Sequence, residues 1–229
     1  NSRISNELFL YIRSMKERSG ETYIQELIKE GEHQQQDFKF EISDVCKIAK
    51  SLSAFANTDG GRLLIGVKDN GKIAGVHSEE EQYMIQAAAE LFCVPPVAFE
   101  MTTYIVEGKQ VLLTEIKRAR KRPVYAKGED GKLTAYVRVA DENILATPVH
   151  LRYWQQSESQ SGELTVYSER EQHLLSLLNE CRMLTLNKCC KLSGLPRPVT
   201  IKLLARFIRY GIVEAIYKEH QFYFTQRNS

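Results

Sequence analysis

SAFANTDGGRLLIGVKDNG, residues 53–71, joins two regular elements through a pair of glycines. Before the glycines, residues 45–57 carry apolar side chains at helical spacing and follow Asp44, a residue type that favours the N-cap of a helix. After them, residues 62–67 form an apolar run typical of a buried strand. Where a helix turns directly into a strand, glycine supplies positive φ values and room between crowded backbones. The stretch therefore predicts a helix-to-strand joint at Gly60-Gly61.

Outward from this joint, helical and strand patterns alternate. Asn70-Gly71 suits the positive φ values of a two-residue hairpin turn. Apolar spacing predicts further helices over residues 21–30, 78–92 and 149–154. Strands are predicted near 97–106, 110–117 and 133–139. The expected fold class is α+β, with a mixed or antiparallel sheet.

The pattern changes after a polar segment, QQSESQSGELT, that spans residues 155–165. Ser168 and Glu171 have the spacing of a capping box, and helical patterns follow near 186–192 and 198–209. Two short strand patterns then close the chain. Helix, helix, turn, helix and hairpin is the order of a winged helix, so we expect three parts: a domain over 1–154, a linker over 155–165 and a winged helix-turn-helix over 166–229.

The composition predicts a folded, soluble protein. The chain has 229 residues, 43% of them hydrophobic and 26% charged, which is enough to bury a core. No apolar run reaches the roughly 18 residues that a membrane helix needs, so we expect no membrane contact and a cytoplasmic location. The five cysteines form no CxxC pair, as expected of reduced thiols, and no cofactor is expected.

Positive charge is concentrated toward the end of the chain. Residues 166–229 carry ten Lys and Arg against five Glu, a net charge of +5, whereas residues 1–165 carry 21 basic and 24 acidic side chains. A second concentration, KRARKR at 117–122, places five cations within six residues. Such clusters neutralise phosphates, although charge runs are also common in solvated loops.

Several of these motifs resemble the Schlafen-type AlbA domain family. The octapeptide EHQQQDFK at 32–39 is similar to the family's acidic-x4-acidic-Phe-Lys opening, and 54–61 with 64–71 resemble its AFANT-x-GG and IGV-x-D-x-G signature. Weaker similarity lies at 122–125 and 136–139. The resemblance covers roughly residues 30–147, and it implies a nucleic-acid-binding domain.

The resemblance also implies two alternative activities. In animal members, the corresponding three carboxylates form a metal-dependent ribonuclease site for structured RNA, which would place Glu32, Asp37 and Asp69 around Mg²⁺ or Mn²⁺. Bacterial relatives with one AlbA unit and a winged helix are regarded as DNA-binding regulators. Under that second hypothesis, which we favour, the three carboxylates are structural or vestigial and do not form a working nuclease.

The leading hypothesis is a bacterial DNA-binding transcription regulator that prefers DNA to RNA. A homodimer would fit the two-fold habit of regulators, but no sequence pattern specifies one. The cations of the 117–122 run, two residues carried by the resemblance and the outer face of the third tail helix are the expected contacts. These candidate residues are Lys39, Lys117, Arg118, Arg120, Lys121, Arg122, Arg138, Arg197, Thr200, Lys202, Arg206 and Arg209.

Overall fold

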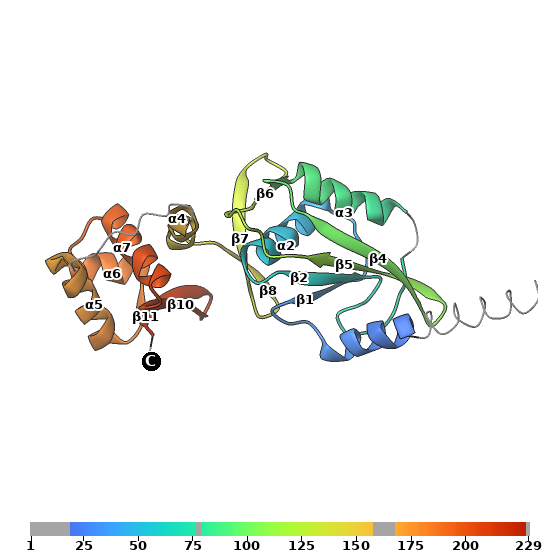
Figure 1. Ribbon diagram of the computed structural model, residues 1–229, viewed down its shortest axis with the longest axis horizontal. Coiled ribbons are helices and arrows are strands. Elements are labelled where there is room, and N and C mark those ends of the chain that lie inside the picture. Colours follow the sequence, from blue (N-terminus) through green and yellow to red (C-terminus); the bar gives the residue numbers. More distant parts are fainter. Residues whose placement is uncertain (1–18, 77–78, 158–167, 228–229) are drawn as a thin grey trace, which may run out of the picture. The chain divides into compact units, whose positions relative to one another are not determined.

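The computed structural model describes residues 19–76, 79–157 and 168–227 and divides the chain into two compact units (Figure 1). Among the described residues, the first unit comprises those up to residue 120 and residues 124–145, and the second comprises residues 121–123 and those from residue 146 onward. In the described part of the chain, no helix has the length and apolar character required to cross a bilayer.

The first unit contains two four-stranded sheets, which confirms the predicted α+β class. One sheet has the order β1-β2-β5-β4 and the other β3-β6-β7-β8. β1 runs parallel to β2, and every other pair is antiparallel. The strands are β1 (Gln36–Lys39), β2 (Gly61–Ile65), β3 (Cys93–Val94), β4 (Phe99–Val106), β5 (Lys109–Ile116), β6 (Tyr125–Lys127), β7 (Leu133–Val139) and β8 (Glu142–Leu145).

The helix α2 (Val45–Asn57) lies at the centre of this unit (Figure 1). As predicted, Asp44 caps it: the carboxylate accepts hydrogen bonds from the backbone N–H groups of Cys46 and Lys47. Leu52 and Phe55 are fully buried in a core that includes side chains of β2, β5 and β6. Because α2 packs against strands of both sheets, it connects them.

In the described part of the first unit, two more helices pack against this framework. α3 (Glu80–Leu91) packs against α2, with Ile85 in the same core. A helix over residues 19–30 covers the opposite face of the first sheet, where Ile24 and Leu27 bury against Phe38, Leu64 and Leu113. The β1-β2-β5-β4 sheet therefore has apolar packing on both faces.

The described residues of the second unit form four helices and a three-stranded sheet of order β10-β11-β9. Its elements are α4 (Pro148–Ser157), α5 (Glu169–Cys181), β9 (Leu184–Thr185), α6 (Leu186–Ser193), α7 (Arg197–Arg209), β10 (Val213–Lys218) and β11 (Gln221–Gln226). From α5 onward the three helices and the hairpin follow in the predicted order, with the strand β9, which was not predicted, between α5 and α6. The predicted capping residue Glu171 accepts hydrogen bonds from the backbone N–H and the hydroxyl of Ser168. DNA binding by this unit stays a prediction.

The predicted boundary after residue 154 differs from this division. α4 packs against α7, and its side chains Val149 and Trp154 are buried within the second unit. Burial of these two apolar side chains is the physical reason that the helix belongs there. Residues 155–157 of the predicted linker form the last turn of α4, and residues 158–165 lie outside the described residues.

Candidate nucleic-acid interface

The Gly-Gly joint that the sequence singles out is a close-packed corner. Gly60 has a φ of +73°, and a Cβ atom there would lie 2.7 Å from the carbonyl oxygen of Ile116. A Cβ atom at Gly61 would lie 2.3 Å from the Phe55 ring. Real Cβ atoms do not come so close, so both positions require glycine for packing.

The polar residues of the same motif attach the end of α2 to the second sheet. The amide of Asn57 donates to the carbonyl oxygens of Val124 and Tyr136 at 2.8 and 2.9 Å and accepts the N–H of Val124 at 2.7 Å. The hydroxyl of Thr58 accepts the N–H of Arg138 at 2.9 Å. Buried polar groups need such partners, so the motif acts in the architecture of the unit.

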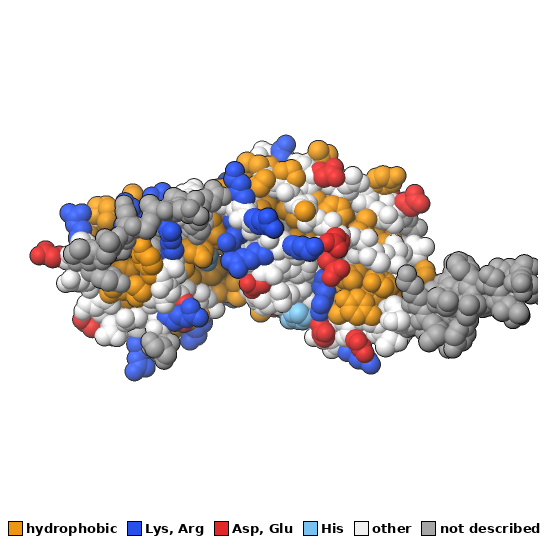
Figure 2. Space-filling model, in the orientation of Figure 1, with side chains coloured by type: hydrophobic (Ala, Val, Ile, Leu, Met, Phe, Trp, Pro, Cys, Tyr) orange, Lys and Arg blue, Asp and Glu red, His pale blue; other side chains and the backbone are white. Residues whose placement is uncertain are grey.

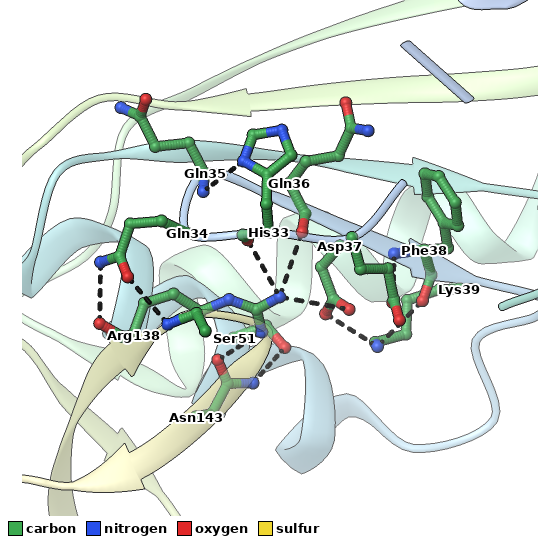
Figure 3. Close-up of polar contacts among 12 residues, drawn as sticks. His33, Gln34, Gln35, Gln36, Asp37, Phe38, Lys39, Ser51, Arg138 and Asn143 are labelled. Atoms are coloured by element: carbon green, nitrogen blue, oxygen red, sulfur yellow. Dashed lines mark hydrogen bonds and ion pairs between the residues drawn. The ribbon is translucent and has the colours of Figure 1, made fainter. Parts of the chain in front are cut away.

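Arg138 is a structural residue, which corrects its prediction as a nucleic-acid contact. It is 2% exposed, and its guanidinium group stacks 5.1 Å from the centre of the Phe55 ring. Figure 3 shows the guanidinium among its acceptors: it donates to the side chain of Asn143 at 3.0 Å and to the carbonyl oxygen of Gln36 at 3.1 Å. A side chain so enclosed cannot reach a phosphate.

Asp37 forms the acidic side of this buried cluster. It is 3% exposed, and its carboxylate lies 3.7 Å from Arg138 and 2.8 Å from the ammonium group of Lys39 (Figure 3). Lys39 also donates to the carbonyl oxygen of Phe38 at 3.0 Å. The charge of Lys39, another predicted contact, is therefore compensated within the chain.

Glu32 lies beside Asp37. Its carboxylate accepts the backbone N–H of Phe38 at 2.9 Å. Burial, together with the hydrogen bond and negative charge of the neighbouring Asp37 carboxyl, raises the pKa of Glu32 to about 7. The first two carboxylates of the family pattern thus form a close pair next to Lys39.

Asp69 does not join this pair. It is exposed in the turn beyond the end of β2, whereas Asp37 pairs in register with Leu63 inside that strand. Within residues 19–76, 79–157 and 168–227, no three His, Cys, Asp or Glu side chains are grouped so that they could hold a metal ion. Glu32, Asp37 and Asp69 therefore do not fit the three-carboxylate metal site that the resemblance implies, and two cations occupy the surroundings of the first two.

The basic loop after β5 is attached to the core at its middle. The N–H of Ala119 donates to the carbonyl oxygen of Ala56 at 2.8 Å, while the flanking Arg118 and Arg120 are exposed. Lys117 pairs with Glu100 at 2.6 Å, and this contact raises the pKa of the lysine. Lys121 is also exposed, and Arg122 is half-buried.

A hollow of about 370 Å³ lies beside this loop. Gln35, Gly61, Arg62 and Arg118 line it together with the acids Asp59, Glu100 and Glu115. Arg62, which the sequence did not single out, donates to Gln36 and pairs with Glu30. On the face of the first unit that Figure 2 shows, basic and acidic side chains stand next to each other. Acidic side chains thus compensate part of the loop's positive charge.

Some of the residues predicted as contacts on α7 are exposed and others are buried. Arg197, Lys202 and Arg209 are exposed, in agreement with a surface role. Thr200 is fully buried, and its hydroxyl donates to the carbonyl oxygen of Pro196 at 3.3 Å. The prediction of Thr200 as a contact residue is therefore wrong, because its side chain points into the core.

Arg206 is held in an internal ion pair. Its guanidinium lies 2.5 Å from the carboxylate of Glu171, a group that is almost fully buried. Although burial raises the pKa of Glu171, hydrogen bonds from Ser168 and from Arg206 lower it below its ordinary value. The charge of Arg206 thus serves to compensate Glu171, which removes it from the predicted contacts.

α4 adds a feature that the sequence did not indicate. A hollow of about 580 Å³ lies between α4 and α7, lined by apolar side chains and by three cations. The apolar residues are Pro148, Leu151, Pro198, Val199 and Ile201, and the cations are Arg152, Arg197 and Lys202. Arg197 is oriented by donating to the side chain of Asn187 at 2.6 Å. The sequence predicts the helix that contains Arg152. The position of Arg152 beside α7 follows only from how that helix packs.

The first unit thus defines an α+β domain that a Gly-Gly joint and a buried Arg-Asp cluster hold together. The family model for Schlafen, AlbA_2 matches residues 32–147, just over half of the 229-residue chain. The chain belongs to this family.

Solved structures show distant similarity. The DIP2311 protein from Corynebacterium diphtheriae is 18% identical with a TM-score of 0.42, over 65% of this chain and 35% of that one. This chain therefore spans about a third of that protein. The N-terminal domain of a RecG-related protein from Nitrosomonas europaea is 21% identical with a TM-score of 0.39, over 66% of this chain and 95% of that one. Among curated proteins, none matches.

Proposed function

We propose that this protein binds nucleic acid, prefers duplex DNA, and acts as a DNA-binding regulator. The observation that carries the proposal is the cationic surface of the second unit. Arg152, Arg197 and Lys202 line one hollow beside α7, and no described residue lining that hollow is acidic. The location that goes with this function is the cytoplasm.

The shape of this surface favours DNA over RNA. An α-helix fits the wide major groove of B-form DNA, where helical side chains reach both phosphates and base edges. The major groove of A-form RNA is deep and narrow, so the same helix cannot enter it. A duplex ligand that docks on α7 is therefore expected to be DNA.

The basic loop after β5 is proposed as a second, sequence-independent contact. Arg118, Arg120 and Lys121 are exposed, and none forms an ion pair with a described residue. Each cation that neutralises a phosphate makes binding more salt-dependent. The loop would thus increase affinity for any duplex without reading its sequence.

The proposed regulatory role goes beyond DNA binding itself. It rests on the order of elements from α5 to β11, which is that of a winged helix with α7 as the recognition helix. Arg197 and Lys202 would then contact base edges and phosphates at the N-terminal half of α7.

Fluorescence polarisation tests the proposal directly. A labelled DNA duplex should bind the full chain, and the logarithm of the binding constant should fall linearly with the logarithm of salt concentration. Unlabelled duplex DNA should compete better than duplex RNA of the same sequence. Binding that is absent at low salt, or that RNA displaces more effectively, would contradict the proposal.

A further inference from the structure

β4 is an edge strand with one free side. It lies at the end of the β1-β2-β5-β4 order and pairs with β5 over its entire length, from Phe99↔Ile116 to Val106↔Lys109 (Figure 1). Eight consecutive residues are long for an exposed edge, since natural edge strands are usually short or protected.

The register of the hairpin identifies the backbone groups on the free side. Glu107 and Gly108 form a two-residue turn with φ values of +50° and +72°, so the flanking pair Val106↔Lys109 is a hydrogen-bonded pair. Hydrogen-bonded pairs alternate along an antiparallel ladder. Val106, Tyr104, Thr102 and Glu100 thus bond to β5, and Phe99, Met101, Thr103 and Ile105 direct their N–H and C=O groups outward.

These outward groups have no hydrogen-bond partner among the described residues. β4 has few of the devices that prevent edge pairing: it contains no Lys, Arg or Pro, its register with β5 has no bulge, and its one charged side chain, Glu100, forms an ion pair with Lys117. Ile105, near its end, is 51% exposed. The edge therefore offers a regular, accessible hydrogen-bonding surface.

We propose that β4 pairs antiparallel with β4 of a second copy of this chain, around a two-fold axis at Thr102. An antiparallel strand is self-complementary under such an axis, and outward residues must face outward residues. In this register Met101 lies opposite Thr103 of the partner subunit, and Phe99 lies opposite Ile105 of the partner subunit. The two sheets become one continuous sheet of eight strands.

Side-chain pairing selects this register. It joins two threonines at the axis and covers the exposed Ile105 with an aromatic ring, both of which are favourable cross-strand pairs. Glu100 lies opposite Tyr104 of the partner subunit, away from its own copy. Centring the pairing on Thr103 would place Glu100 opposite Val106 of the partner subunit and leave a carboxylate facing an apolar side chain. Self-complementarity is the reason to prefer a second copy over a foreign peptide.

A disulfide tests the register. Residues that meet at the axis form a non-hydrogen-bonded pair with Cα atoms about 4.5 Å apart, which lies within disulfide range. Full-length Thr102→Cys should therefore become a covalent dimer under mild oxidation. Thr103→Cys is the matched control, because its two copies would be diagonal neighbours about 7–8 Å apart and should cross-link several-fold less. The wild type sets the background from its native thiols. Equal cross-linking of all three proteins would overturn the proposal.

Light scattering after size exclusion tests the edge itself. The wild type should be dimeric, and Thr103→Pro should be monomeric because it removes an outward N–H without breaking a bond to β5. Thr103→Val retains that N–H and should remain dimeric. A wild type that is monomeric at every concentration, or a Thr103→Pro variant as dimeric as Thr103→Val, would overturn the proposal. Either result leaves the proposed DNA binding untouched.

Discussion

At residue 138, a positive charge lies inside the first unit, and both terminal nitrogens of the guanidinium donate to fixed acceptors. Asn143, Gln36 and Asp37 surround the guanidinium, and Phe55 packs against its face. Burying a charge is unfavourable unless it is paired and hydrogen-bonded, so these contacts depend on one another. The role of Arg138 is to hold β7 against β1 and α2.

Replacing Arg138 with Leu should destabilise the first unit. The variant leaves the buried Asp37 carboxylate with Lys39 alone, and breaking a buried pair costs about 3–5 kcal/mol in the free energy of unfolding. Urea denaturation measures this loss, with the exposed Arg118→Leu as the control that should stay close to wild type. An Arg138→Leu protein of normal stability that loses only nucleic-acid affinity would restore the original prediction.

Glu32 gives the first unit a distinct pH dependence. Its pKa in the folded state is about 7, raised by burial and by Asp37, and is higher than in the unfolded chain. The folded state therefore binds the proton more tightly, so this contribution is present below the unfolded pKa and is lost as pH rises through about 7. In Glu32→Gln, which retains an acceptor for the N–H of Phe38, that loss should disappear.

Denaturation at pH 5 and pH 8 compares the two proteins. We expect the wild type to lose on the order of 1 kcal/mol more than Glu32→Gln over this range, after allowance for partial exposure to solvent. Identical pH profiles would show that Glu32 ionises normally.

Among the elements, α4 extends the second unit beyond its predicted start. Val149 lies in the core of that unit, Trp154 of the same helix is 3% exposed, and α4 forms one wall of the cationic hollow. Trp154→Ala should lower the stability of the second unit by about 3–5 kcal/mol because it leaves a large cavity. Calorimetry should show a lower melting temperature for one of two transitions. A shift of the first unit's transition instead would return α4 to the predicted first domain.

Elements with strong local signals were predictable from the sequence. α2 has its cap at Asp44 and an apolar face, and β4 and β5 are strand-like segments on either side of Glu107-Gly108. β1 was not predicted, because its buried Gln36 and Asp37 interrupt any apolar alternation. β3 and β6 are two and three residues long and are defined by pairing with each other. Such strands depend on tertiary contacts that propensity does not contain.

The candidate site was predictable only as a set of cations. Which of them are available depends on partners far away in the chain: Arg206 meets Glu171, and Lys117 meets Glu100. Burial of Arg138 and Thr200 likewise follows from packing. The helical pattern correctly placed Arg197, Lys202 and Arg209 outside the core, since amphipathic spacing is a local property.

At the scale of the whole molecule, positive charge is unevenly distributed along the chain. Residues 166–229 carry a net charge of +5, whereas the residues before them are slightly acidic in sum. Internal ion pairs compensate several cations, whereas Arg152, Arg197 and Lys202 line the hollow beside α7, and Arg118, Arg120 and Lys121 are exposed in the 117–122 loop. A polyanion is the partner that such a distribution attracts.

The salt dependence of duplex DNA binding by the double variant Arg197→Gln with Lys202→Gln tests this account most directly. Each lost phosphate contact should reduce the slope of log binding constant against log salt by about 0.9, so the double variant should bind more weakly and with a slope about 1.8 smaller. Arg170→Gln, which removes an exposed charge from α5, should change neither quantity. A double variant with the affinity and slope of the wild type would contradict DNA binding through α7.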